Sequence, residues 1–132
     1  MIGIDTNILV RYITQDDARQ AALAVRFIEG TLSAAEPGHA SLVTLAELAW
    51  VLRSNYAATP EEVAGAMTLL LTDARFVVQA KSAVWAALDM YRDGGADFGD
   101  TLIAALDRDA GCVRTMTFDT KATRIPGMTL LR

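Results

Sequence analysis

The chain lacks most of the side chains on which small metal sites and nucleophilic enzymes depend. Its 132 residues include one cysteine, Cys112, and one histidine, His39. These counts exclude a disulfide framework and a zinc site with Cys and His ligands, and they leave no partner for a catalytic histidine. We expect Cys112 to fill the core from a strand and His39 to lie in a loop or at the start of a strand. Any catalysis must therefore use carboxylates.

Long hydrophobic runs are also missing. Although 52% of the residues are hydrophobic, no apolar stretch approaches the length that crosses a bilayer. The first residues lack the basic start and the small-residue cleavage site of a signal peptide. We therefore expect a cytoplasmic protein without membrane association, folded as a single domain over residues 1–132.

An excess of positive charge is the third absence. The formal net charge is −4, whereas nucleic-acid-binding domains usually carry a basic face. However, if four of the 16 acidic residues bind one cation, the remaining residues carry no net charge, and nearby arginines and lysines can still form a basic patch. Net charge therefore does not exclude nucleic acid as a partner.

Short apolar runs alternate with helical patterns along the chain, which predicts βα units and a mostly parallel sheet. The expected strands cover residues 2–5, 39–43, 75–79, 113–118 and 128–131. Asp16 or Asp17 is expected to cap the first of the predicted helices. Four further helices are expected over residues 44–56, 59–73 and 82–92, and from a start within 97–100 to a residue before Gly111. Right-handed crossovers would join the five strands into a three-layer α/β/α sandwich with a mostly parallel five-stranded sheet.

Acidic residues follow several of these strands. In such sheets, sites form beyond the carboxyl ends of the strands. One acid follows the first strand, one lies a helical turn beyond the second, two open the last helix and one follows the fourth strand: Asp5, Glu47, Asp97, Asp100 and Asp119. The sequence therefore predicts that these carboxylates gather at one edge of the sheet.

Helix capping is the alternative interpretation for three of these acids, Asp5, Asp97 and Asp119, because aspartate is favoured at helix N-termini. Glu47 does not fit that interpretation, since Leu45, Leu48 and their neighbours predict an apolar, largely buried helix. A buried carboxylate needs compensation. A hard divalent cation with oxygen ligands, such as Mg²⁺ or Mn²⁺, would hold several carboxylates together and compensate their charge.

Four segments of the chain, "IDTNILVRY", "TLAELAWVL", "DFGDTLIAAL" and "TFDTKA", resemble the signature segments of PIN-domain ribonucleases, and specifically of VapC-type toxins of bacterial toxin–antitoxin pairs. The resemblance extends over essentially the whole chain, with the segments in the family's order and spacing. It implies a PIN-like fold and metal-dependent endonucleolytic cleavage of RNA.

The resemblance also implies roles for individual residues. Asp5, Glu47, Asp100 and Asp119 would form the acidic constellation, with Asp5 and Asp100 as direct ligands of Mg²⁺ or Mn²⁺. Asp97 is similar to an additional acid of this subgroup, and either it or Asp119 would complete the metal site. Glu47 or Asp119 would orient the attacking water.

Substrate contacts are expected from polar and basic residues next to the acids: Thr6, Asn7, Arg11, Arg53, Lys121 and Arg124. Thr6 and Asn7 could equally begin a short helix at Ile8, and each basic residue could be a solvated surface cation. By resemblance, the partners are an RNA substrate and a cognate antitoxin protein. A homodimer is also expected, because 52% hydrophobic residues are more than the core of one small domain can bury, and a partner would cover the rest. The candidate exposed hydrophobic residues are Trp50, Tyr56, Leu69 and Leu71.

Two other functions remain to be distinguished. A phosphatase of the haloacid-dehalogenase kind also places an aspartate after its first strand, but it needs a second aspartate two residues later, where this chain has Asn7. A catalytically silent PIN-like module that binds RNA or another protein would keep the acids without cleaving. Metal-dependent cleavage that an Asp5 substitution abolishes distinguishes the enzyme from the silent module.

Overall fold

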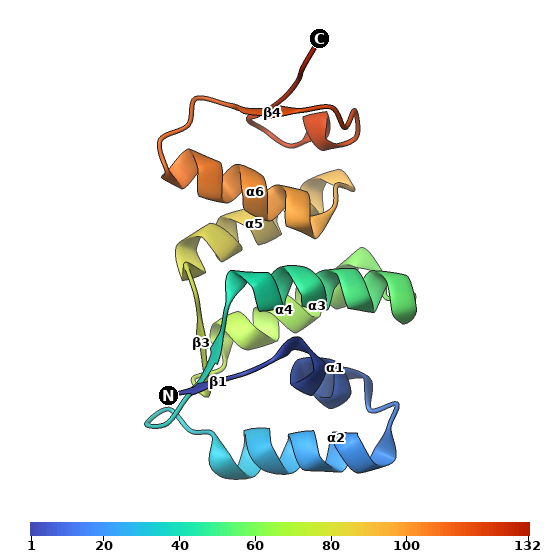
Figure 1. Cartoon of the computed structure of the whole chain (residues 1–132), viewed down its shortest axis with the longest axis vertical. Coiled ribbons are helices and arrows are strands. Elements are labelled where there is room, and N and C mark those ends of the chain that lie inside the picture. The colour runs from blue at the N-terminus through green and yellow to red at the C-terminus, as the bar shows by residue number, and fades with distance from the viewer. The chain divides into compact units, whose positions relative to one another are not determined.

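The computed structural model describes residues 1–132 and divides them into two compact units, Met1–Gln79 and Ala80–Arg132. The elements of the first unit are β1 (Ile2–Gly3), α1 (Thr6–Thr14), α2 (Ala18–Val25), the π-helical turn η1 (Arg26–Thr31), β2 (Gly38–Ala40), α3 (Leu42–Asn55), α4 (Pro60–Thr72) and β3 (Phe76–Val78). Those of the second unit are α5 (Lys81–Gly94), α6 (Phe98–Asp109), β4 (Thr115–Thr117), the 3₁₀ turn η2 (Ala122–Arg124) and β5 (Met128–Leu130). Figure 1 labels most of these elements.

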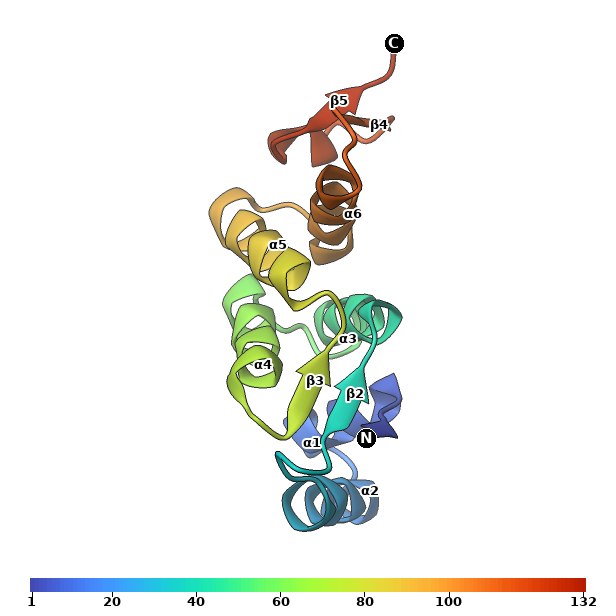
Figure 2. The same ribbon diagram turned by 90° about the vertical axis from the view of Figure 1, so that its left-hand side faces the viewer.

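In the first unit, three parallel strands form a sheet in the order β1-β2-β3. Ile2 pairs with Gly38, and His39 pairs with Val77; Figure 2 shows β2 and β3 side by side with the same direction. Helices α1 and α2 connect β1 to β2, and α3 and α4 connect β2 to β3. The core contains fully buried side chains from four of these helical segments, among them Leu9, Ile28, Leu45, Leu48, Met67 and Leu70.

Local sequence signals place the helix starts of this unit. Asp17 caps α2 by accepting a hydrogen bond from the backbone N–H of Gln20 at 2.9 Å. Thr59 and Glu62 form a capping box, with Pro60 at the first helical position. These contacts satisfy backbone donors that the first helical turn leaves unpaired, so the helices begin where the sequence predicts.

Strand β2 passes very close to its neighbours at Gly38. A Cβ atom at this position would overlap the side chain of Ile4 and press against Leu32. Both of these side chains are buried, so they have little room to move. Glycine at position 38 therefore allows β2 to lie beside β1. Asp5 follows β1 in the chain after Ile4.

In the second unit, β4 and β5 form a parallel two-stranded sheet. Helices α5 and α6 pack on each other, and the rings of Tyr91 and Phe98 meet edge to face with their centroids 5.5 Å apart. Gly95 ends α5 in the left-handed conformation, as the Gly-Gly sequence predicts. Ile125 and Met128 add to a buried cluster with Ala96 and Ala104.

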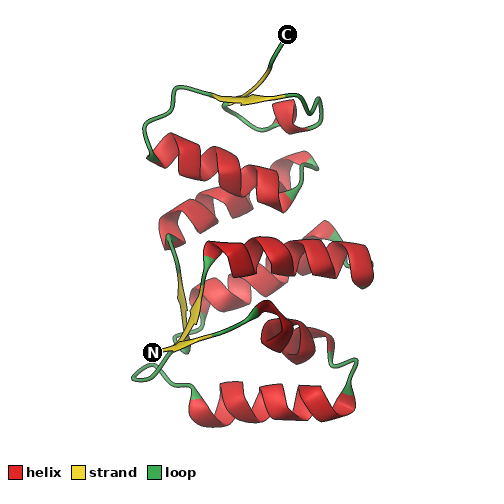
Figure 3. Ribbon diagram, viewed as in Figure 1, coloured by secondary structure: helices red, strands yellow, loops and turns green.

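All five predicted strands exist and their pairings are parallel, but they form two separate sheets of three and two strands. Each strand is also only two or three residues long (Figure 3). In the predicted strand 113–118, the outer residues Val113 and Phe118 are 96% and 80% exposed and lie outside β4. Mixed α/β architecture with parallel strands is therefore confirmed, whereas the single five-stranded sheet is not.

The prediction that Cys112 fills the core from a strand is wrong, because Cys112 is exposed. Gly111 has φ +94°, and its N–H bonds back to the carbonyl of Arg108, while the N–H of Cys112 bonds to the carbonyl of Asp107. These two bonds form the glycine-terminated end of α6. Cys112 therefore belongs to a helix terminus rather than to the following strand.

Exposed apolar residues agree in part with the prediction. Trp50 is 62% exposed and Leu69 is also exposed, whereas Tyr56 is half-buried. Leu71 is buried, because it lies with Leu70 on the part of α4 that enters the core. The prediction for Leu71 is therefore wrong.

Candidate metal-dependent active site

Asp5 lies where the first strand turns into a helix. β1 ends at Gly3, and Asp5 is the N-cap of α1. Its Oδ1 accepts a hydrogen bond from the backbone N–H of Thr6 at 2.8 Å. The side chain is exposed, so the aspartate does not interrupt the buried part of the apolar run. Capping and a ligand role are compatible here, because Oδ2 is not used by the cap.

Glu47 lies on α3 and is held by a residue of α1. The hydroxyl of Thr6 donates a hydrogen bond to Glu47 Oε1 at 3.2 Å, and Thr6 itself is only 7% exposed. The expectation that Glu47 is largely buried is wrong, since Glu47 is exposed. Leu45 and Leu48 enter the core, and Glu47 projects from another side of the same helix. Its placement beside Asp5 therefore comes from the Thr6 contact and not from burial.

Asp5 and Glu47 line one hollow with a volume of about 370 Å³. The other residues around it are Thr6, Asn7, Val10, Arg11, Val51, Asn55 and Tyr56. The first unit thus brings together two predicted catalytic acids and three predicted substrate-contact residues. Carboxylates that could bind a cation lie beside an arginine that could bind a phosphate.

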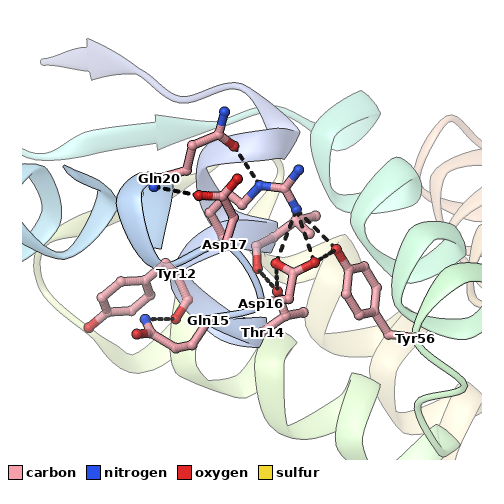
Figure 4. A network of polar contacts seen from close by, with 9 residues as sticks. Tyr12, Thr14, Gln15, Asp16, Asp17, Gln20 and Tyr56 are labelled. Carbon is pink, nitrogen blue, oxygen red and sulfur yellow. Dashed lines mark hydrogen bonds and ion pairs between the residues drawn. The ribbon is translucent and has the colours of Figure 1, made fainter. Parts of the chain in front are cut away.

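The Arg11 side chain is fixed by a polar network that no local sequence pattern predicts. Figure 4 shows its members Asp16, Gln20 and Tyr56. Arg11 Nη1 donates to Asp16 Oδ1 at 3.1 Å and to the Tyr56 hydroxyl at 3.0 Å, and Nε donates to Gln20 Oε1 at 2.6 Å. The Tyr56 hydroxyl donates to Asp16 Oδ2 at 2.6 Å. Hydrogen bonds from Tyr56 and Thr14, together with the charge of Arg11, lower the pKa of Asp16.

A sequence signal for this network exists in the two adjacent aspartates, Asp16 and Asp17. Only one of them can cap α2, and the structure assigns that role to Asp17. The other, Asp16, is then free to form an ion pair with Arg11. No local pattern indicates Tyr56 as the third member, because it comes from the end of α3.

Arg53 lies away from this hollow. Its guanidinium donates to the carbonyl of Ala58 at 2.8 Å and so holds the loop that follows α3. Arg53 also does not line the hollow that contains Asp5 and Glu47. The structure therefore gives Arg53 a contact with the loop after α3, and its role as a substrate contact stays a prediction.

The second unit contains the other three acids. Asp97 is the N-cap residue of α6 without a side-chain capping bond, Asp100 lies in the first turn of α6, and Asp119 follows β4. Burial raises the pKa of Asp100, and the negative charges of Asp97 and Asp119 raise it further. Asp97 and Asp119 are therefore close enough to Asp100 to disfavour its negative charge.

The side chain of Asp119 has a local structural role, whereas the side chain of Asp97 does not cap its helix. Asp119 Oδ1 accepts a hydrogen bond from the backbone N–H of Lys121 at 2.9 Å, which stabilises the turn before η2. Asp97 has no such bond, so capping does not explain its side chain. Lys121 and Arg124 are exposed beside this turn, where a substrate phosphate could reach them.

The donor chemistry of these acids fits a divalent cation. Within each unit, none of Asp5, Glu47, Asp97, Asp100 and Asp119 forms an ion pair with a basic side chain. Neither unit by itself gathers three or more acidic, histidine or cysteine side chains into a group that could hold a metal ion. Carboxylate oxygens, crowded enough around Asp100 to raise its pKa, are nevertheless the ligand type that Mg²⁺ and Mn²⁺ prefer.

Comparison with protein families identifies one match: the model described as the PIN domain matches residues 2–128. The matched range contains all five acids and extends over both units. A comparison with curated proteins finds no significant match. In addition, none of the helices has the length and apolar character needed to span a membrane.

Proposed function

The chain belongs to the PIN-domain family, a family of nucleases that generally depend on metal ions, and from this premise we propose that it is a divalent-metal-dependent endoribonuclease and the toxin of a type II toxin–antitoxin pair. The observation that carries the proposal is the hollow that Asp5 and Glu47 share with Asn7 and Arg11. It combines anionic oxygen donors for a cation with a fixed guanidinium for a phosphate. The cation would supply Lewis acidity toward a phosphodiester, and the guanidinium would help to bind its negative charge.

Asp5 and Asp100 would bind a Mg²⁺ or Mn²⁺ ion directly, and Asp97 or Asp119 would complete the site. Such an ion supplies Lewis acidity toward the scissile phosphate. Glu47 is suited to orient the attacking water, since Thr6 holds Oε1 and leaves Oε2 to accept a proton. Asp119 is the alternative for this role. Arg11, Asn7, Lys121 and Arg124 would contact the RNA backbone.

The proposal includes the arrangement of the whole chain. We propose that residues 1–132 act as one PIN-like domain of the cytoplasm, in which the two sheets belong to a single three-layer α/β/α sandwich. An experimental structure with Mn²⁺ bound tests this, and separate ions on each unit would contradict it.

Cleavage of RNA by the purified protein is the direct test. We expect discrete fragments from total RNA with Mg²⁺ or Mn²⁺, and no fragments with excess chelator, because the acids need a cation to act on an anionic substrate. Mapping the fragment ends identifies the cleavage site. A folded protein that binds RNA but does not cleave it with either ion would instead indicate the catalytically silent PIN-like module.

A homodimer and a cognate antitoxin are the proposed protein partners. Trp50 and Val43 on α3 are 62% and 70% exposed, and such apolar positions are typical of surfaces that a partner covers. We expect light scattering to show a dimer, and coexpression of the neighbouring gene to relieve growth inhibition. A monomer whose toxicity no neighbouring gene product changes would contradict both partners.

A further inference from the structure

A second hollow adjoins the one that contains Asp5 and Glu47. It lies between α1 and the helical segment of α2 and η1, and its volume is about 510 Å³, within the range of small-molecule sites. The residues around it are Asn7, Ile8, Arg11, Arg19, Gln20, Leu23, Ala24 and Phe27. Asn7 and Arg11 line both hollows, so a ligand could extend from one into the other.

The lining of this hollow combines apolar surface with positive charge. Ile8, Leu23 and Phe27 offer apolar surface, and Leu23 is 46% exposed although it is a large aliphatic side chain. Arg11 and Arg19 supply positive charge, and no acidic residue lines the hollow. Flat apolar surface next to arginines is the combination that binds a nucleobase together with its phosphate.

Some polar side chains of the hollow keep N–H groups that form no hydrogen bond within the protein. Such donors suit an anion or the edge of a nucleobase. Arg11 uses Nε and Nη1 for Gln20, Asp16 and Tyr56, which fixes the plane of the guanidinium and leaves Nη2 available. Gln20 accepts from Arg11 through Oε1, so its amide NH₂ remains free to donate. Arg19 is exposed and forms no ion pair.

We propose that the hollow between α1 and α2 binds one nucleotide of the RNA substrate next to the scissile phosphate. The base lies against Leu23 and Phe27, and its phosphate lies between Arg11 and Arg19. This inference rests on the proposed ribonuclease function. Charge complementarity favours a nucleotide over an apolar protein segment, because Arg19 would remain without an anionic partner beneath such a segment, whereas a phosphate can pair with Arg19 and with the free Nη2 of Arg11.

Titration with mononucleotides tests the site without cleavage. AMP, CMP, GMP, UMP and inorganic phosphate are added separately to the full-length protein with chelator present, and amide NMR signals are followed. We expect at least one nucleotide to bind more tightly than phosphate and to shift signals of residues 19–27. Arg19→Gln and Leu23→Ser should each weaken this binding about fivefold or more.

Two matched variants control for charge and for surface polarity. Arg26→Gln removes the same charge from an exposed position outside the hollow, and Leu69→Ser makes the same kind of change at an exposed leucine of α4. Neither should change nucleotide binding. Leu23 is exposed and Arg19 is fully on the surface, so the test variants should fold, which a melting curve verifies.

Three results would overturn the inference. Phosphate binding as tightly as every nucleotide would show an anion site without a base site, and no shift at millimolar nucleotide would show no site. Unchanged nucleotide binding in Arg19→Gln and Leu23→Ser, with weakened binding of the antitoxin, would show that a protein occupies the hollow. Nucleotide binding by a protein that cleaves no RNA would instead contradict only the ribonuclease function.

Discussion

Asp5→Asn and Asp100→Asn are each expected to lower RNA cleavage by about 100-fold or more while the fold persists. Asparagine has nearly the shape of aspartate but lacks the charge that a hard cation requires. The interaction of an ion with a transferring phosphate is worth several kcal/mol, and about 1.4 kcal/mol corresponds to a factor of ten in rate. Asparagine also caps helices almost as well as aspartate, so α1 should still begin after residue 5.

Single-turnover cleavage at limiting Mn²⁺ measures this effect. The matched control for Asp100 is Asp109→Asn, because Asp109 is exposed at the end of the same helix. The sequence predicts Asp107 as an outward position that is equally neutral to substitution, but Asp107 Oδ2 accepts a hydrogen bond from the Thr115 hydroxyl at 2.7 Å. Asp107 is therefore unsuitable as a control. Near-normal cleavage by Asp5→Asn or Asp100→Asn would show that the acid concerned is not a ligand.

The second large effect concerns stability in the presence of metal. A ligand that binds only the folded state stabilises it by about 2.7 kcal/mol at 100 times its dissociation constant. For a chain of this size, that corresponds to a rise of roughly 10 °C in melting temperature. Mg²⁺ or Mn²⁺ should therefore raise the melting temperature, and Ca²⁺ should do so without supporting cleavage.

Asp100→Asn should stabilise the metal-free protein and remove most of the metal-induced rise. Burial and the charges of Asp97 and Asp119 raise the folded-state pKa of Asp100. The stability that its protonation contributes is therefore present below the unfolded-state pKa and is lost as the pH rises through the folded-state pKa. At neutral pH the metal-free protein carries the full repulsion, and asparagine relieves it.

Melting curves of the wild type, Asp100→Asn and Asp109→Asn, each with chelator and with excess metal, measure both parts of this prediction. Asp109→Asn should behave like the wild type in both conditions. If Asp100 serves only the first turn of α6, its replacement will be nearly neutral and the metal-induced rise will persist. That result would remove Asp100 from the proposed ligands.

Local patterns in the sequence were sufficient to identify the five strands and the α-helices other than α1, whose start at Thr6 was only an alternative to a substrate contact. The capping box at Thr59, the glycines after α5 and the alternation of apolar runs with helical stripes act over a few residues, so they predict the helices and the five strand positions without any knowledge of distant contacts. The same local reasoning places Asp5 after β1 and Asp100 in the first turn of α6. Strand lengths and sheet membership depend on pairing between distant segments, which is why a single sheet was expected and two were found.

The surroundings of the acids were decided by tertiary structure alone. Helical periodicity cannot tell on which side of a mostly apolar helix the core will lie, so Glu47 was expected inside and is exposed. The sequence by itself determined that carboxylates follow the strands. Only the packing of α1 against α2 and α3 produced the hydrogen bonds from Thr6 to Glu47 and from Arg11 to Tyr56. These contacts join residues that are 41 and 45 positions apart, beyond the range of any local pattern.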